Sequence, residues 1–251
     1  YTVTGTNNNG CSASAQVTVN VNALPVINVA QPSPICTGQQ TATLTATGAN
    51  TYSWSPSTAL SSTTGSSVTA SPSSTTTYTV TGTDNNGCTS SAQVTVNVNP
   101  LPVINVPQPS PICAGQQTAT LTATGANTYS WSPSTALSAT TGSSVTANPA
   151  STTTYTVTGT DINGCTASAQ VTVNVNPLPV INVTQPPAIC LGQQTVTLTA
   201  SGANTYSWSP STALSATTGS SVSANPLSTT TYTVTGTDNN GCTASAQVTV
   251  N

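Results

Sequence analysis

Apolar and polar residues alternate with a period of two along short stretches of this chain. In "TATLTATG", Ala42, Leu44 and Ala46 fall on one side and threonines on the other. In "TYSWS", Tyr52 and Trp54 share one face. Such alternation predicts β-strands with one buried face. No stretch has the helical periodicity of an amphipathic helix, so we expect an all-β protein.

Four further stretches alternate in the same way and are separated by turn residues. They are "VINVAQ" at 26–31, "SSVTASP" at 66–72, "YTVTGT" at 78–83 and "AQVTVNVN" at 92–99. The "NNG" between the last two is typical of a hairpin turn that needs positive φ. Short antiparallel strands at this spacing predict a β-sandwich of immunoglobulin-like type.

The whole pattern recurs at a constant interval. "YTVTGT" begins at Tyr1, Tyr78, Tyr155 and Tyr232, and the copies at 78–154 and 155–231 differ at only ten positions. Near-identical copies predict tandem domains with one fold, which we expect to form an extended rod.

Leu-Pro dipeptides mark the expected domain starts. We predict domains over 24–100, 101–177 and 178–251, with 1–23 forming the last two strands of a preceding repeat. Two strands cannot bury a core alone, so we expect a longer native chain. Each small core should also need support from neighbours or from a covalent link.

Two aromatic positions per repeat are candidate core residues. Trp beside an inward Tyr on the third strand, and Tyr at the start of "YTVTGT", both fall on the inward face. A sugar-stacking surface is the alternative reading of the tryptophans. These residues are Trp54, Trp131, Trp208, Tyr78, Tyr155 and Tyr232.

Composition removes most catalytic chemistry. The chain has no Lys, Arg, His or Glu, and its only charged side chains are Asp84, Asp161 and Asp238. General acid–base catalysis needs a group that titrates near the working pH, and a Ser or Thr nucleophile needs an activating base. We therefore expect no enzymatic activity and no cofactor.

The same composition limits the partners. Nucleic acids and anionic membranes are bound mainly through Lys and Arg, and no run of about 18 apolar residues predicts a membrane span. With a formal net charge of −3, little repulsion keeps chains apart, so we expect self-association or contact with neighbouring chains. A glycan or surface ligand is a second expectation.

The aspartate in each "TDNNG" turn has two interpretations. Calcium prefers about six to eight oxygen ligands, and one Asp per turn is a poor set. We favour an aspartate that accepts backbone hydrogen bonds within its own hairpin turn, so no metal site is predicted.

Seven cysteines stand at two alternating spacings, one of them about twice the other. Regular pairs in a Ser- and Thr-rich β chain predict disulfides and an oxidising compartment. The positions are Cys11, Cys36, Cys88, Cys113, Cys165, Cys190 and Cys242.

Strand order favours disulfides between repeats. Cys36 precedes the second strand at one end of the sandwich, and Cys88 follows the last hairpin turn at the other end. Eight strand residues separate those ends by about 26 Å, whereas a disulfide joins Cα atoms about 4.4–6.8 Å apart. In a head-to-tail array, Cys36 reaches Cys165 instead.

By the same reasoning Cys113 pairs with Cys242. Cys11, Cys88 and Cys190 would then pair with repeats outside this window. Two alternatives stay open, namely pairing within each repeat and links between chains.

Three phrases resemble a known family. "ICTGQQTATLTATGANTYSWSPSTALS", "TTTYTVTGTDNNGC" and "AQVTVNVNPLP" are similar to the tandem immunoglobulin-like or PKD-like repeats of large Bacteroidota surface proteins. Such proteins are commonly exported by type IX secretion, and some are gliding-motility adhesins or surface filaments. The resemblance covers the whole chain and implies an extracellular, cell-surface location.

The leading functional hypothesis is a non-enzymatic structural region of an extracellular filament or adhesin stalk. The alternatives are a glycan- or surface-binding adhesive module, and accessory repeats tethered to a catalytic domain outside this window. Sequence variation confined to one loop would favour the binding module. The repeats instead differ by mild substitutions scattered along the sequence, which favours the structural role.

Overall fold

The computed structural model describes residues 1–190 and 192–251, and this part of the chain contains β-strands but no helix. The prediction of an all-β, immunoglobulin-like fold is confirmed. The chain divides into two compact units, 1–101 with 163–165 and 102–162 with 166–251.

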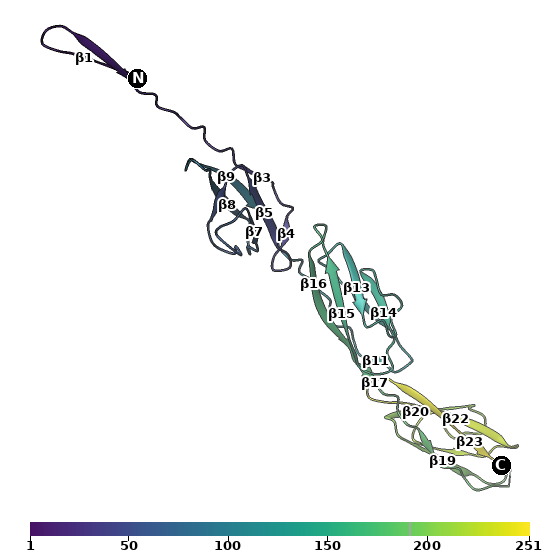
Figure 1. Ribbon diagram of the computed structural model, residues 1–251. Coiled ribbons are helices and arrows are strands. Elements are labelled where there is room, and N and C mark those ends of the chain that lie inside the picture. The colour runs from purple at the N-terminus through teal and green to yellow at the C-terminus, as the bar shows by residue number, and fades with distance from the viewer. Residues whose placement is uncertain (191) are drawn as a thin grey trace. The chain divides into compact units, whose positions relative to one another are not determined.

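The strands form one isolated hairpin and three similar sandwiches (Figure 1). The hairpin is β1 (Thr2–Thr6) with β2 (Ser12–Gln16). The first sandwich contains β3 (Asn28–Val29), β4 (Ile35–Cys36), β5 (Ala42–Thr47), β6 (Thr51–Ser55), β7 (Ser67–Ala70), β8 (Thr76–Thr83), β9 (Thr89–Val96) and β10 (Val98–Asn99).

The second and third sandwiches follow the same order with fewer strands. In the second, a bridge between Asn105 and Thr124 stands in place of β3, and the described residues of the third have no counterparts of β4 and β10. The second contains β11 (Ile112–Cys113), β12 (Ala119–Thr122), β13 (Thr128–Ser132), β14 (Ser144–Ala147), β15 (Thr153–Thr160), β16 (Thr166–Val173) and β17 (Val175–Asn176). The third contains β18 (Asn182–Val183), β19 (Val196–Ser201), β20 (Thr205–Ser209), β21 (Ser221–Ala224), β22 (Thr230–Thr237) and β23 (Thr243–Val250).

Each complete sandwich pairs two antiparallel sheets. In the first sandwich the strand orders are β3-β5-β7 and β6-β8-β9, and β4 pairs with β10 in parallel. Within the longest hairpin, β8 and β9 pair from Thr76↔Val96 to Thr83↔Thr89. This register places the buried faces of both strands on the same side.

The inward residues of the two sheets make the core. Leu44, Tyr78 and Val80 are fully buried, and Trp54 is 4% exposed. The polar tips of the aromatic residues have backbone partners, since Tyr78 Oη donates to the Thr58 carbonyl at 2.9 Å and Trp54 Nε1 to the Gly65 carbonyl at 2.9 Å. Burial raises the pKa of Tyr78, so its phenol stays neutral and keeps donating.

The segment between β6 and β7 covers one edge of each sheet. The Trp54 amide on β6 donates to the Thr63 carbonyl at 2.8 Å, and the Ser61 amide donates to the Thr69 carbonyl on β7 at 2.9 Å. Unpaired edge strands are the usual route to edge-to-edge association. The β6 and β7 edges therefore already have partners within the sandwich.

The first predicted strand differs in the structure. We expected one strand over 26–31, but the chain forms β3 in one sheet and then crosses to form β4 beside β10. Pro32 and Pro34 lie between the two pieces. Proline has no amide hydrogen for a β-ladder, so pairing stops there and resumes in the other sheet.

A glycine in the middle of the "YTVTGT" strand allows close packing. A Cβ at Gly159 would overlap Ile104 Cδ1 and lie 2.7 Å from Ala126 Cβ, and Gly82 and Gly236 have the same surroundings. Real Cβ atoms do not approach so closely, so the isoleucine fills the space that the glycine leaves.

We expect Gly→Ala at positions 82, 159 and 236 together to lower the free energy of unfolding by about 1–3 kcal/mol per sandwich, because the added methyl overpacks the core. Thr→Ala at 79, 156 and 233, on the outward face of the same strands, should change it by less than about 0.5 kcal/mol. Urea unfolding followed by circular dichroism measures both, and equal effects of the two substitutions would contradict the packing account.

Candidate functional site

Two disulfides connect cysteines that lie far apart in the sequence. Cys36 is bonded to Cys165, and Cys113 to Cys242, each pair separated by 129 residues. Their Cα atoms lie 5.5 and 5.4 Å apart, within the usual range for a disulfide. These are the inter-repeat pairs that strand order favours. Each connects one sandwich to the next, so we call it a joint.

One side of the second joint is the short strand β11. Cys113 ends this strand, opposite Asn176 of β17, and the Ala114 amide donates to the Asn176 carbonyl at 3.0 Å. The chain then turns through Gly115, whose φ of +68° is left-handed, a conformation that glycine adopts without strain. The Cys113 amide donates to Gln117 Oε1 at 3.3 Å. These bonds fix the position of the Cys113 sulfur.

The other side is the hairpin turn between β22 and β23. Asp238 Oδ1 accepts hydrogen bonds from the Asn240 amide at 2.8 Å and from the Cys242 amide at 2.8 Å. The Gly241 amide donates to the Asp238 carbonyl at 3.2 Å, with φ of +81° at Gly241. The aspartate therefore shapes the turn that presents Cys242, as the sequence interpretation of "TDNNG" expects.

A glutamine beside the disulfide adds a second connection. Gln116 Nε2 donates to the Thr243 carbonyl at 2.6 Å and to Thr243 Oγ1 at 3.2 Å. In return, the Thr243 amide donates to Gln116 Oε1 at 3.3 Å. The side-chain amide thus pairs with the backbone of Thr243 in both directions, as a neighbouring strand would.

Sequence reasoning did not identify this glutamine. The available signal is the phrase "GQQ" after Cys36, Cys113 and Cys190, which places two amide side chains beside each of these cysteines. In the second sandwich, Gln116 donates a hydrogen bond across the joint to Thr243. Gln117 accepts a hydrogen bond from the Cys113 amide.

The joints bury their cysteines. Cys36 and Cys113 are each 2% exposed, and Cys165 and Cys242 are fully buried. The free thiols differ, because Cys11 and Cys190 are exposed and Cys88 is partly exposed.

The free thiols nevertheless have the same local settings as the bonded cysteines. The Cys88 amide donates to Asp84 Oδ1 at 2.9 Å, and the Cys11 amide to Asn7 Oδ1 at 3.1 Å. The Cys190 amide donates to Gln194 Oε1 at 3.1 Å. Each free thiol is therefore presented like one half of a joint.

The candidate core aromatics lie inside the sandwiches. Trp54, Trp131 and Trp208 are at most 4% exposed, and Tyr78, Tyr155 and Tyr232 are fully buried. Each indole donates to a glycine carbonyl at 2.9 Å. None of these rings offers a face for stacking against a sugar.

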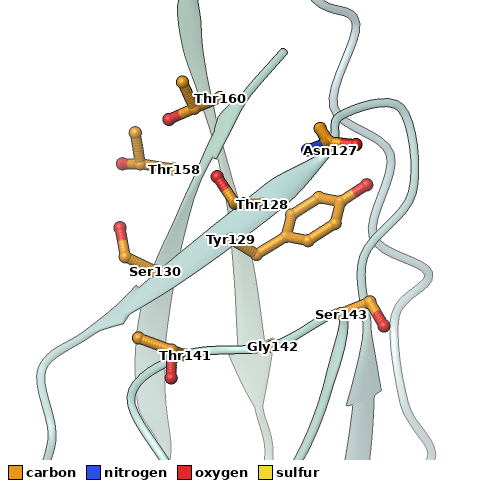
Figure 2. A pocket seen from close by; sticks show the side chains of 9 residues that line it. All are labelled: Asn127, Thr128, Tyr129, Ser130, Thr141, Gly142, Ser143, Thr158 and Thr160. Atoms are coloured by element: carbon orange, nitrogen blue, oxygen red, sulfur yellow. The ribbon is translucent and has the colours of Figure 1, made fainter. Parts of the chain in front are cut away.

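An open groove of about 530 Å³ lies beside β13. Figure 2 shows the hydroxyls of Ser130, Thr158 and Thr160 on the opposite side of β13 from the Tyr129 ring. Tyr129 Oη already donates to the Ala126 carbonyl at 2.9 Å. An equivalent groove of the same volume lies beside β20 in the third sandwich. The lining offers neutral hydrogen-bonding groups and no titratable base.

Among the described residues, no three His, Cys, Asp or Glu side chains gather as a metal site. No helix in that part of the chain is long and apolar enough to cross a membrane.

Comparison with known proteins gives structural likeness only. No protein-family model and no curated protein matches the chain. A three-domain fragment of the titin I-band is 14% identical, with 92% of this chain and 99% of that chain covered, at a TM-score of 0.41. The eight N-terminal immunoglobulin domains of Down Syndrome Cell Adhesion Molecule are 16% identical, covering 96% and 44%, at a TM-score of 0.41.

A third similar structure is a Ca²⁺-stabilised adhesin that helps an Antarctic bacterium bind ice. It is 13% identical, with 99% of this chain and 80% of that chain covered, at a TM-score of 0.41. Similarity at this level carries no information about ligands or activity.

We expect Asp238→Ala to make the Cys113–Cys242 disulfide about 3- to 10-fold more rapidly reduced by dithiothreitol, because losing two turn hydrogen bonds costs about 1 kcal/mol or more and favours local opening. Asp238→Asn should leave the rate near that of the wild type, since Asn7 makes the same bonds in the first hairpin. Alkylation and mass spectrometry measure the rate.

The Cys36–Cys165 disulfide of the same molecule is the internal control. Equal acceleration of both disulfides, or an asparagine variant as labile as the alanine variant, would contradict this role of the aspartate.

Proposed function

We propose that this chain is a non-enzymatic, structural repeat region of an extracellular filament or cell-surface adhesin stalk. Its tandem domains would cover 24–100, 101–177 and 178–251, with 1–23 belonging to a preceding repeat, arranged as a rigid extended rod. The observation that supports this best is the pair of buried disulfide joints, each connecting one sandwich to the next.

A covalent joint between successive domains suits a mechanical role. The usual linker between tandem domains permits relative motion, whereas the second joint fixes the neighbouring turns with a disulfide and the Gln116–Thr243 hydrogen bonds. Cys88, Cys190 and Cys11 would make the same joints with neighbouring repeats, since their turns match those of the bonded cysteines.

The chemistry of the chain supports the same role. The grooves beside β13 and β20 contain no titratable base, and the chain has no Lys, Arg or His, which disfavours acid–base catalysis and nucleic-acid binding. Disulfides persist in oxidising environments, which supports an extracellular location. Low charge and outer hydroxyl pairs, such as Thr154 with Thr172 at 2.8 Å, suit lateral contact with neighbouring chains.

A glycan- or surface-binding module is the second candidate. The observation that favours it is the pair of equivalent grooves, each lined by neutral Asn, Ser and Thr side chains. Such groups suit the hydroxyls of an uncharged polysaccharide. Accessory repeats attached to a catalytic domain elsewhere in a longer protein would have the same local structure.

Small-angle X-ray scattering of the oxidised chain tests the rod. A compact domain of the same chain length has a radius of gyration of about 18 Å, and we expect a value at least about twice as large. Removing one joint with Cys113→Ser and Cys242→Ser should broaden the distribution of interatomic distances, because the domains then move about their linker. A radius of gyration close to that of the compact domain would contradict the rod.

A further inference from the structure

The two disulfides enclose overlapping stretches of the chain. One closes residues 36–165 and the other closes 113–242, so the stretch 113–165 belongs to both. Three segments therefore run between the two joints. Two of them, 36–113 and 165–242, are equal in length, and the third, 113–165, is about two thirds as long.

This connectivity limits how far the chain can be stretched. Without disulfides, the route from Cys36 to Cys242 follows the whole stretch 36–242. With both disulfides, the shortest route crosses to Cys165, runs back along 165–113 and crosses to Cys242. At about 3.5 Å per extended residue, the maximum lengths of the two routes are about 720 Å and about 180 Å.

We propose that the overlapping disulfides form a covalent strap that caps the distance between Cys36 and Cys242 under tension at about a quarter of its unconstrained value. Force can pull a β-sandwich apart because its contacts are noncovalent, but the strap still holds when the sandwiches have unfolded. This proposal rests on the proposed structural function, because it supplies the reason for joining successive domains.

The strap also determines which segments carry tension in a longer array. If Cys88 and Cys190 pair with neighbouring repeats in the same way, each of the short segments 88–113 and 165–190 runs from one joint to the next joint but one. The segment 165–190 contains β16, β17 and β18, and strands already rise about 3.3 Å per residue. This segment is therefore already close to its full extension and lengthens little when it is pulled.

The longer segments, such as 113–165, become cross-links between adjacent joints. In the second sandwich this segment contains β12, β13, β14 and β15, together with the buried Trp131 and Tyr155. When the joints are numbered along such an array, one set of short segments links the odd-numbered joints and a second set links the even-numbered joints. These two sets carry the tension, so most of each hydrophobic core bears none of it.

Force spectroscopy on single full-length chains, held at both ends, tests the strap. Removing one disulfide, with Cys36→Ser and Cys165→Ser or with Cys113→Ser and Cys242→Ser, changes the shortest route from 113–165 to 36–113 or to 165–242. The fully unfolded chain should then lengthen by about 90 Å. Removing both disulfides should lengthen it by about 540 Å. Cys190→Ser is the matched control and should change nothing.

Pairing within repeats predicts different increments. Each double variant would then break two disulfides and release two such loops, for example 36–88 and 113–165, which lengthens the chain by about 360 Å. Cys190→Ser would break one disulfide and lengthen the chain by about 180 Å. Either result overturns the strap. Should a variant fail to fold, stepwise reduction of the wild type under force replaces it. The strap predicts two steps, of about 90 Å and then about 450 Å, whereas pairing within repeats predicts three equal steps of about 180 Å.

The strap and the rod can fail separately. A compact particle in scattering, with force increments of about 90 Å and about 540 Å, would overturn the proposed function and leave the covalent connectivity intact. An elongated particle with increments of about 180 Å for each lost disulfide would keep the rod and overturn the strap.

Discussion

The geometry of the disulfide bond is the constraint on which the rest of this structure depends. A disulfide spans about 4.4–6.8 Å between Cα atoms, and a strand of about eight residues separates the ends of a sandwich by about 26 Å. Each repeat places one cysteine at each end, beside β11 and after the β15–β16 turn in the second sandwich. The two cannot meet in one domain, and in the second sandwich each bonds to the complementary end of a neighbouring sandwich.

Hydrogen bonds to backbone groups, rather than ion pairs, hold these joints. With no Lys, Arg or His, the chain has no cationic side chain to pair with its three carboxylates. Asp238 instead accepts from two backbone amides, and Gln116 exchanges hydrogen bonds with the Thr243 backbone. Interactions of this kind depend little on bulk salt, which suits the extracellular location that we propose.

The sequence predicts the strands well because their alternation is regular. It also places Trp131 and Tyr155 in the core, and strand order alone favours the pair Cys36–Cys165. The split of the first strand at Pro32 depends on which sheet offers a partner. The reach of Gln116 depends on the neighbouring domain. Neither is visible in local periodicity, because both are set by contacts between segments distant in sequence.

Non-reducing peptide mapping by mass spectrometry tests the central claim most directly. Cleavage after aromatic residues places the cysteines on four peptides, 2–52, 79–129, 156–206 and 233–251. The account predicts that 2–52 is linked to 156–206 and that 79–129 is linked to 233–251 in the oxidised chain. A link between 2–52, which carries Cys36, and 79–129, which carries Cys88, would contradict the joints and the strap together.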